Sequence, residues 1–120
     1  MAIVRPFKSL RPRHDLVGRV ASLPYDVMDR KEAKAMAKGN PYSFLHIVRS
    51  EIDYPSSTDQ YDPKVYSKAR KNLRVFEDDG ILVSDEKPMI YIYRQIMDGR
   101  EQTGFVGVTS VDDYQNNVIK

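Results

Sequence analysis

Hydrophobic and polar residues alternate with helical spacing in two segments of the chain. Asp29 precedes an alanine-rich run that ends at Gly39, and this order of cap, helix formers and stop predicts a helix over residues 30–38. A second helix is predicted to begin at Pro63 and to end before Gly80. Its apolar residues share one face: Val65, Tyr66, Ala69, Leu73 and Phe76. Its other face is basic: Lys64, Lys68, Arg70, Lys71 and Arg74.

The last third of the chain has the two-residue alternation that is typical of β-strands. Residues 81–83 form a short apolar run, and residues 89–97 alternate isoleucine with tyrosine. Asp98-Gly99 follows directly and is a strong signal for a two-residue turn, with a return strand over residues 100–111. These features predict a C-terminal β-hairpin.

Residues 43–49 form the stretch that is most informative about function. Asparagine before proline marks a turn just ahead of them, and their apolar run with its β-branched residues predicts a strand. Three charged side chains follow at alternate positions, Arg49, Glu51 and Asp53, and on an extended chain they share one face. The alternatives are a site in which the three converge on one ligand and a buried strand followed by a solvated, salt-bridged loop.

The N-terminal part of the chain is less regular. Residues 2–10 predict a short strand that Arg5-Pro6 interrupts, and residues 16–23 predict a weak strand or a helical turn. No repeat or linker separates these elements from the rest. The sequence therefore predicts a single α+β domain over residues 1–120, with a mixed or antiparallel sheet, the C-terminal β-hairpin and two main helices.

The composition excludes several classes of function. The chain has 120 residues, of which 41% are hydrophobic and 30% charged, as is typical of a globular domain. It contains no cysteine, so disulfides, thiolate catalysis and cysteine-ligated zinc are excluded. The net charge of +2 gives no broad nucleic-acid footprint. Because no apolar run approaches ~20 residues, we expect a cytoplasmic protein without membrane contact.

The candidate site residues carry charges or hydroxyl groups that suit several roles. Arg5 and Arg11 lie in a basic N-terminal stretch, where guanidinium groups bind phosphate or simply face solvent. Asp26 lies in a turn, where an aspartate can act as a base, bind a metal or stabilise the turn. Ser43 and His46 do not form a catalytic triad, and His46 is expected to be a satisfied core histidine. No standard nucleotide-binding or hydrolase motif is present.

Several spaced motifs resemble those of a prokaryotic protein family of unknown function. In the first half they are Arg5-Pro6-Phe7-Lys8, Leu10-Arg11-Pro12, Pro24-Tyr25-Asp26-Val27, Asn40-Pro41, Ser43-Phe44-Leu45-His46 and Glu51-Ile52-Asp53. In the second half they are Val65-Tyr66, Lys68-Ala69, Asn72-Leu73, Tyr91, Tyr93-Arg94, Gln102-Thr103-Gly104 and Ser110-Val111-Asp112-Asp113-Tyr114. Some relatives in this family resemble ATP-dependent kinases of free serine with a ParB/sulfiredoxin-like fold. The resemblance implies the N-terminal portion of such a kinase, incomplete for catalysis.

The resemblance also implies a site for ATP and magnesium beside a pocket for a small amino acid. Phosphoryl transfer needs cations that hold the phosphate charge and a carboxylate that orients the attacking hydroxyl or binds magnesium. The phosphate-binding residues implied are Arg5, Arg11 and Arg49. The catalytic carboxylates implied are Glu51, Asp53 and Asp26. The substrate-binding residues implied are Ser43 and His46.

Two other functions stay open at this point. The first is a non-catalytic module that binds nucleic acid through the basic face of the helix after Pro63, although that face is more simply the solvent side. The second is a domain that assembles with a missing C-terminal remainder of the same protein, for which the apolar Val118-Ile119 is the cue. The kinase is the favoured function, and nucleic acid is less favoured as a partner than a small molecule.

Overall fold

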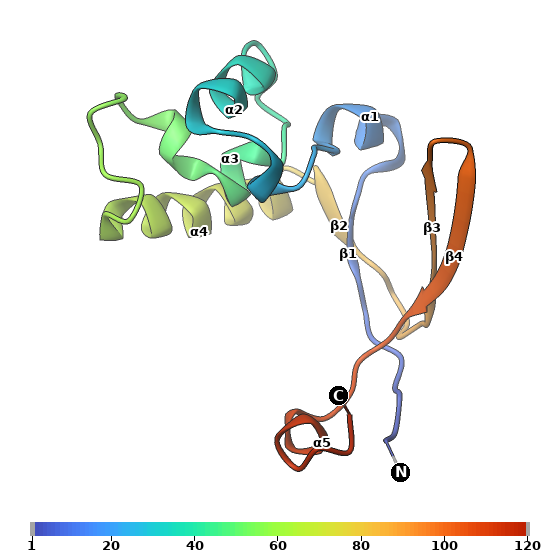
Figure 1. The fold of residues 1–120 in the computed structure, drawn as a ribbon. Coiled ribbons are helices and arrows are strands. Elements are labelled where there is room, and N and C mark those ends of the chain that lie inside the picture. The colour runs from blue at the N-terminus through green and yellow to red at the C-terminus, as the bar shows by residue number, and fades with distance from the viewer. Residues whose placement is uncertain (1, 120) are drawn as a thin grey trace. The chain divides into compact units, whose positions relative to one another are not determined.

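The chain folds into two compact units in the computed structural model, which describes residues 2–119 (Figure 1). One unit consists of Arg11–Val83, and the other combines Met1–Leu10 with Ser84–Lys120. Helices dominate the first unit and a β-hairpin dominates the second. The α+β class is therefore confirmed, whereas the single domain that the sequence predicts stays a prediction.

The chain passes from one unit to the other twice, once within each strand of a short pair. β1 (Leu10–Pro12) pairs with β2 (Leu82–Ser84) in a two-stranded sheet. The pair continues at one end in a hydrogen bond from the Arg13 amide to the Ile81 carbonyl, at 2.8 Å. The predicted strand over residues 81–83 is thus confirmed, one residue further along the chain.

The unit Arg11–Val83 is built almost entirely of helices. Its α-helices are α1 (Val17–Val20), α2 (Arg30–Ala37), α3 (Leu45–Val48) and α4 (Pro63–Asp78). Single 3-10 turns accompany them: η1 (His14–Leu16), η2 (Tyr25–Val27) and η3 (Ser50–Asp53). Figure 1 shows α3 between α2 and α4. The two main helices are confirmed as α2 and α4, and η1 with α1 confirms the helical-turn alternative for residues 16–23.

The two long helices begin and end where the sequence predicts. Asp29 caps α2, because its side chain accepts a hydrogen bond from the Glu32 amide at 2.8 Å. Asp62 caps α4 in a similar way, at 3.0 Å from the backbone amide two residues further on. A glycine in the left-handed region follows each helix, with a φ of 72° at Gly39 and 68° at Gly80.

Two apolar clusters hold the helices of this unit together. Leu45 of α3 has only 1% of its surface exposed. It belongs to a cluster formed with Met28, Ala33, Ala37 and Ile52. The second cluster consists of Leu16, Val20, Phe76, Ile81 and Leu82. Burial of Leu45 against Met28 and the alanines of α2 holds α3 in place, and the turn that follows α3 carries the candidate site.

The strand predicted over residues 43–49 is wrong, because this segment is helical. α3 and η3 follow one another with only Arg49 between them. The hydroxyl oxygen of Ser43 accepts a hydrogen bond from the Leu45 amide at 3.3 Å, which satisfies one donor at the start of α3. A short apolar run fits either a strand or a buried helical turn, and the packing of Leu45 selects the turn here.

The second unit contains a β-hairpin and a short helix. Its elements are β3 (Tyr91–Met97), β4 (Arg100–Val106) and α5 (Val111–Gln115). β3 and β4 pair antiparallel, and Asp98 and Gly99 form the turn with φ angles of 52° and 77°. The predicted hairpin is confirmed. The predicted return strand over residues 100–111 is too long, because Ser110 caps α5 by accepting from the Asp112 amide at 3.1 Å.

The predicted N-terminal strand is wrong as a continuous element. Arg5 and Phe7 form isolated β-bridges, to Val108 and Met89 respectively. Pro6 lies between them and has no amide hydrogen to donate, so a regular ladder cannot form there. No helix within residues 2–119 is long and apolar enough to cross a membrane.

Candidate functional site

Residues 46–53 contribute to two pockets of the unit Arg11–Val83. Successive side chains of a helical segment point in different directions, whereas alternate side chains of a strand share a face. Asp53 lines one pocket, and Arg49 and Glu51 line the other. The three charged side chains that a strand would bring together are therefore divided between two sites.

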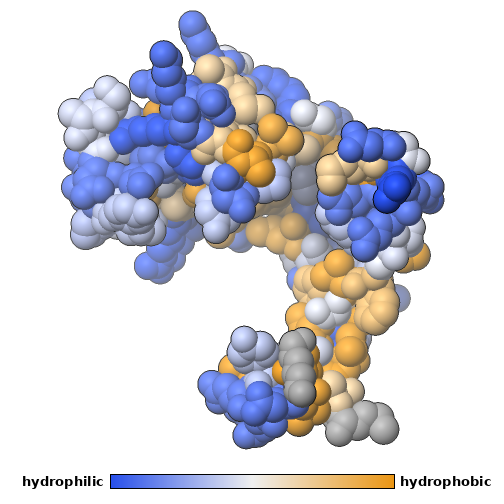
Figure 2. Space-filling view, in the orientation of Figure 1, coloured by the Kyte–Doolittle hydropathy of each residue, from blue (hydrophilic) through white to orange (hydrophobic). Residues whose placement is uncertain are grey.

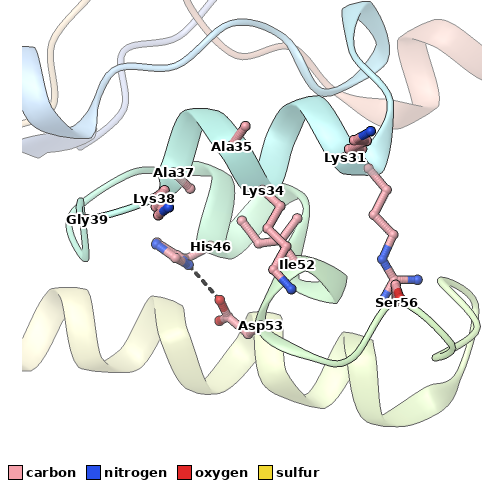
Figure 3. Close-up of a pocket in the computed structure, with 11 residues that line it drawn as sticks. Lys31, Lys34, Ala35, Ala37, Lys38, Gly39, His46, Ile52, Asp53 and Ser56 are labelled. Carbon is pink, nitrogen blue, oxygen red and sulfur yellow. Dashed lines mark hydrogen bonds and ion pairs between the residues drawn. The ribbon is translucent and has the colours of Figure 1, made fainter.

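The first pocket, here named the basic pocket, is a cavity of about 780 Å³. Lys31, Lys34 and Lys38 come from α2 and its C-terminal flank. The other lining residues are Arg30, Ala35, Ala37, Gly39, His46, Ile52, Asp53 and Ser56. Figure 3 shows Lys34 extending from α2 toward the turn that carries Asp53. Figure 2 shows that hydrophilic residues predominate on the visible surface near α2 and α4.

The three lysines of the basic pocket have no ionic partner. Within residues 2–119, Lys31, Lys34 and Lys38 make no side-chain hydrogen bond and no ion pair. Their positions, three and four residues apart, place them on the same side of the helix, where like charges repel. A bound anion relieves this repulsion, so the arrangement favours a phosphate or carboxylate ligand.

Arg30 lines the same pocket but serves the fold. Its guanidinium donates hydrogen bonds to the backbone carbonyl of Glu51 at 3.0 Å and to that of Pro55 at 2.8 Å. It also donates to the carbonyl of Thr58. One planar cation thus holds the loop after η3 against the start of α2, and this defines one side of the pocket.

His46 and Asp53 form a hydrogen-bonded pair in the basic pocket (Figure 3). The Nδ1 atom of His46 lies 2.7 Å from an Asp53 carboxylate oxygen, and Nε2 lies 3.0 Å from the Asn40 carbonyl oxygen. Both partners are acceptors, so the ring satisfies both only when both of its nitrogens carry a proton. Asn72 donates to the second Asp53 oxygen at 3.0 Å. Asp53 is therefore fixed in place, and its oxygens retain lone pairs for a further donor.

Arg49 and Glu51 form an ion pair beside the second pocket. Arg49 Nε lies 2.5 Å from Glu51 Oε1, and only 14% and 7% of the two side chains are exposed. The same guanidinium donates to the carbonyl oxygens of Tyr25 and Met28, both at 3.0 Å. The pair is thus internally compensated and holds η2 against the turn between α3 and η3.

The other predicted site residues do not gather at the basic pocket. Asp26 is exposed and lines the second pocket. Ser43 is buried, and its hydroxyl bonds to the backbone of α3. Arg5 belongs to the second unit, and Arg11 lies in β1 and lines neither pocket. The functional roles predicted for these residues stay predictions.

The lysines of the basic pocket and Asn72 were not predicted as site residues. For the lysines a signal was present, because positions 31, 34 and 38 share one side of a helix that the sequence predicts. Asn72 carried no such signal. Its contact with Asp53 depends on the packing of α4 beside α3, which the spacing of residues along the chain does not specify.

The basic pocket fits the phosphates of a nucleotide better than it fits a protein-bound metal. Its ammonium groups suit phosphate oxygens, and the apolar side chains of Ala35, Ala37 and Ile52 suit the flat face of a base. Among the described residues 2–119, Asp53 is the one carboxylate that lines it. No group of three or more histidine, aspartate or glutamate side chains that could hold a metal occurs in residues 2–119. Magnesium would therefore be held mainly by phosphate oxygens and water.

The chain matches a protein-family model over residues 4–120. The family is described as "Protein of unknown function (DUF1015)", a description that assigns no activity. No curated protein and no solved structure matches the chain.

Proposed function

The chain belongs to the DUF1015 family of proteins of unknown function, and we propose that it supplies the nucleotide pocket of an ATP-dependent kinase of free serine. Two lines of support meet in this proposal. The geometry of the basic pocket supports an organic phosphate as ligand. The spaced motifs resemble those of a family in which some relatives resemble serine kinases, and this supports the acceptor and the ParB/sulfiredoxin-like fold, which are parts of the proposal.

The observation that carries the proposal is the row of unpaired lysines over a cavity of about 780 Å³. Nucleotide-sized ligands occupy cavities of roughly 300–1,000 Å³. Lys34 and Lys38 line the pocket together with His46, whose ring nitrogens lie within hydrogen-bond distance of Asp53 and of the Asn40 carbonyl. The proposal thus assigns the phosphates to residues of α2 and its flank, while the phosphate-binding roles of Arg5, Arg11 and Arg49 stay predictions.

Asp53 is the residue that we assign to the acceptor. When bound, magnesium and ATP supply an activated phosphoryl group. Asp53 accepts the proton of the serine hydroxyl as that oxygen bonds to the γ-phosphorus and the bond to the departing ADP breaks. His46 and Asn72 act as positioning residues, because each donates to one oxygen of the Asp53 carboxylate.

Isothermal titration of the chain with ATP, with and without magnesium, tests the nucleotide pocket. A charge-assisted hydrogen bond contributes about 1.5 kcal/mol, so we expect Lys34→Ala and Lys38→Ala each to weaken ATP about tenfold. Lys71→Ala is the matched control, because Lys71 is exposed on α4 and lines neither pocket. Equal affinities for ATP in all three variants would exclude the basic pocket as the nucleotide site.

The acceptor is tested separately, by the formation of phosphoserine from ATP and L-serine in the full-length kinase of which the resemblance implies that this chain is the N-terminal portion. We expect Asp53→Asn to abolish this product while ATP still binds, because the carboxylate acts on the acceptor and not on the nucleotide. Asp53→Asn protein that binds ATP and makes phosphoserine at the normal rate would remove the role of Asp53.

A nucleic-acid-binding module remains the second candidate, since the basic residues of α4 that line neither pocket are mostly exposed. Binding of a single-stranded oligonucleotide that weakens steeply with salt and is lost in Lys71→Ala/Arg74→Ala protein would favour it. Oligonucleotide binding that competes with ATP would instead place both ligands in the basic pocket.

A further inference from the structure

The second pocket is a cavity of about 390 Å³ that three tyrosines surround, and it is named the tyrosine pocket. It belongs entirely to the unit Arg11–Val83. Its lining residues are Tyr25, Asp26, Met28, Ile47, Val48, Arg49, Ser50, Glu51, Gln60, Tyr61, Val65, Tyr66 and Ala69. Its volume lies within the range of roughly 300–1,000 Å³ that is usual for small-molecule sites.

The tyrosine pocket carries a net negative charge. Its charged lining residues are Asp26, Arg49 and Glu51. Arg49 and Glu51 neutralise each other in their ion pair at 2.5 Å, and both are largely buried. Asp26 is exposed and makes no side-chain hydrogen bond or ion pair within residues 2–119. Its carboxylate is therefore left as the uncompensated charge of the site.

The three tyrosines come from three different elements and remain open to a ligand. Tyr25 belongs to η2, Tyr61 to the loop after η3, and Tyr66 to α4. Their exposed fractions are 61%, 69% and 59%, and none of their hydroxyl groups bonds to a residue in the range 2–119. The face of an aromatic ring is negative and attracts cations, most strongly where water is partly excluded.

The walls of this pocket are held in place without a ligand. The two hydrogen bonds from Arg49 to the carbonyls of Tyr25 and Met28 fix η2 beside it. Asp59 accepts from the Tyr61 amide at 2.9 Å, which fixes the loop that carries this ring. A site whose walls are fixed in advance binds with a smaller loss of conformational entropy.

We infer that the tyrosine pocket binds a small organic ammonium ion. Asp26 supplies the opposite charge, and the rings of Tyr25, Tyr61 and Tyr66 supply cation–π contacts and apolar area for the carbon substituents. Elsewhere in the same unit, Lys64 Nζ already lies 5.1 Å from the centre of the Tyr54 ring. The inference rests on the tyrosine pocket alone and does not depend on the kinase proposal.

Choline and its uncharged isostere 3,3-dimethyl-1-butanol are the probes that test this inference. The two have nearly the same shape, so a difference in affinity reports the charge. We expect choline to bind with a Kd in the millimolar range or below, and the isostere to bind at least about tenfold more weakly, as followed by NMR titration. Equal affinity of the two, or no binding of choline at about 20 mM, overturns the inference.

Variants locate the binding. We expect Asp26→Asn and Tyr66→Leu each to weaken choline at least about fivefold while Tm stays within 2 °C or so, since both residues are exposed. Asp78→Asn and Tyr114→Leu are the matched controls, exposed and outside the tyrosine pocket, and should bind choline normally. Choline affinity that is unchanged in Asp26→Asn relative to Asp78→Asn overturns the inference.

Discussion

The basic pocket and the tyrosine pocket share one short segment, residues 46–53, yet they carry opposite charge. In the basic pocket the ammonium groups of α2 outnumber the single carboxylate of Asp53. In the tyrosine pocket Asp26 is the charge that no neighbour compensates. The difference arises from helical winding, because residues that are adjacent in sequence reach different sides of the segment. The two pockets therefore draw on different sides of one short segment.

The two acidic residues of this segment show the same contrast. Glu51 is buried and satisfied by Arg49, whereas Asp53 is partly exposed and lies at the edge of a cavity. A buried, paired carboxylate acts mainly on the fold, and a partly exposed one is available to a ligand. Substitutions at these two positions should therefore affect different properties.

The largest effect is expected from Glu51→Gln. The amide leaves the largely buried Arg49 charge without its partner, and we expect the free energy of unfolding to fall by about 3 kcal/mol. Urea unfolding measures the loss, with Glu77→Gln as the control, because Glu77 is exposed on α4. If the two variants are equally stable, Glu51 is not structural, and its predicted catalytic role becomes the better explanation.

The next effect concerns the independence of the two pockets. We expect the double variant Lys34→Ala/Lys38→Ala to weaken ATP about a hundredfold, or about 2.7 kcal/mol, and to leave choline affinity unchanged. Asp26→Asn should weaken choline and leave the affinity for ATP unchanged. Titration of both ligands against both variants measures the four affinities. A variant of one pocket that changes both ligands would show that the pockets are coupled.

A smaller effect is expected from Asp53→Asn. His46 loses its charged acceptor while Asn72 still has an oxygen to bond, so we expect a loss of about 1 kcal/mol in the free energy of unfolding. A double-mutant cycle with His46→Gln isolates the pair, and a coupling of about 0.5 kcal/mol or more is expected. Additive losses would mean that the 2.7 Å contact contributes nothing to stability.

The smallest effect is expected at the ion pair of Arg13 and Asp15, which is exposed, whereas the pair of Arg49 and Glu51 is largely buried. The hydrogen bond from Arg13 Nε, at 2.7 Å, lowers the pKa of the Asp15 carboxyl below its ordinary value. Its stabilising contribution is present above the ordinary carboxyl pKa and is lost as the pH falls through the lowered pKa. Because both groups are exposed, Asp15→Asn should leave the urea midpoint at pH 7 unchanged.

An NMR titration of the Asp15 carboxyl checks the direction of this shift. Arg13→Ala should raise the Asp15 pKa toward its ordinary value, because it removes the donor. A carboxyl that titrates at the same pH with and without Arg13 would contradict the assignment.

Local signals in the sequence were sufficient for much of the fold. The caps at Asp29 and Asp62 and the turn at Asp98-Gly99 were predictable, because each depends on neighbouring residues alone. The segment from Ser43 onward was not, since four apolar residues fit a strand and a helical turn equally well. Its helical form depends on the burial of Leu45 against residues seven to seventeen positions away.

The candidate site was predictable only in part for the same reason. Asp53, Glu51 and Arg49 are recognisable as a charged cluster in the sequence, but a strand and a helix distribute the cluster differently. The unpaired state of the α2 lysines is a property of the folded chain. So is the contact from Asn72 to Asp53, which joins residues nineteen positions apart.

Arg30 makes the basic pocket intolerant of a substitution that sequence comparison counts as conservative. Its planar guanidinium reaches the carbonyls of Glu51, Pro55 and Thr58 at the same time. The single ammonium of a lysine at this position cannot present donors in the same fork, so Arg30→Lys would release part of the loop after η3. The lysine would keep the positive charge, but the loop that borders the cavity would no longer be held in place.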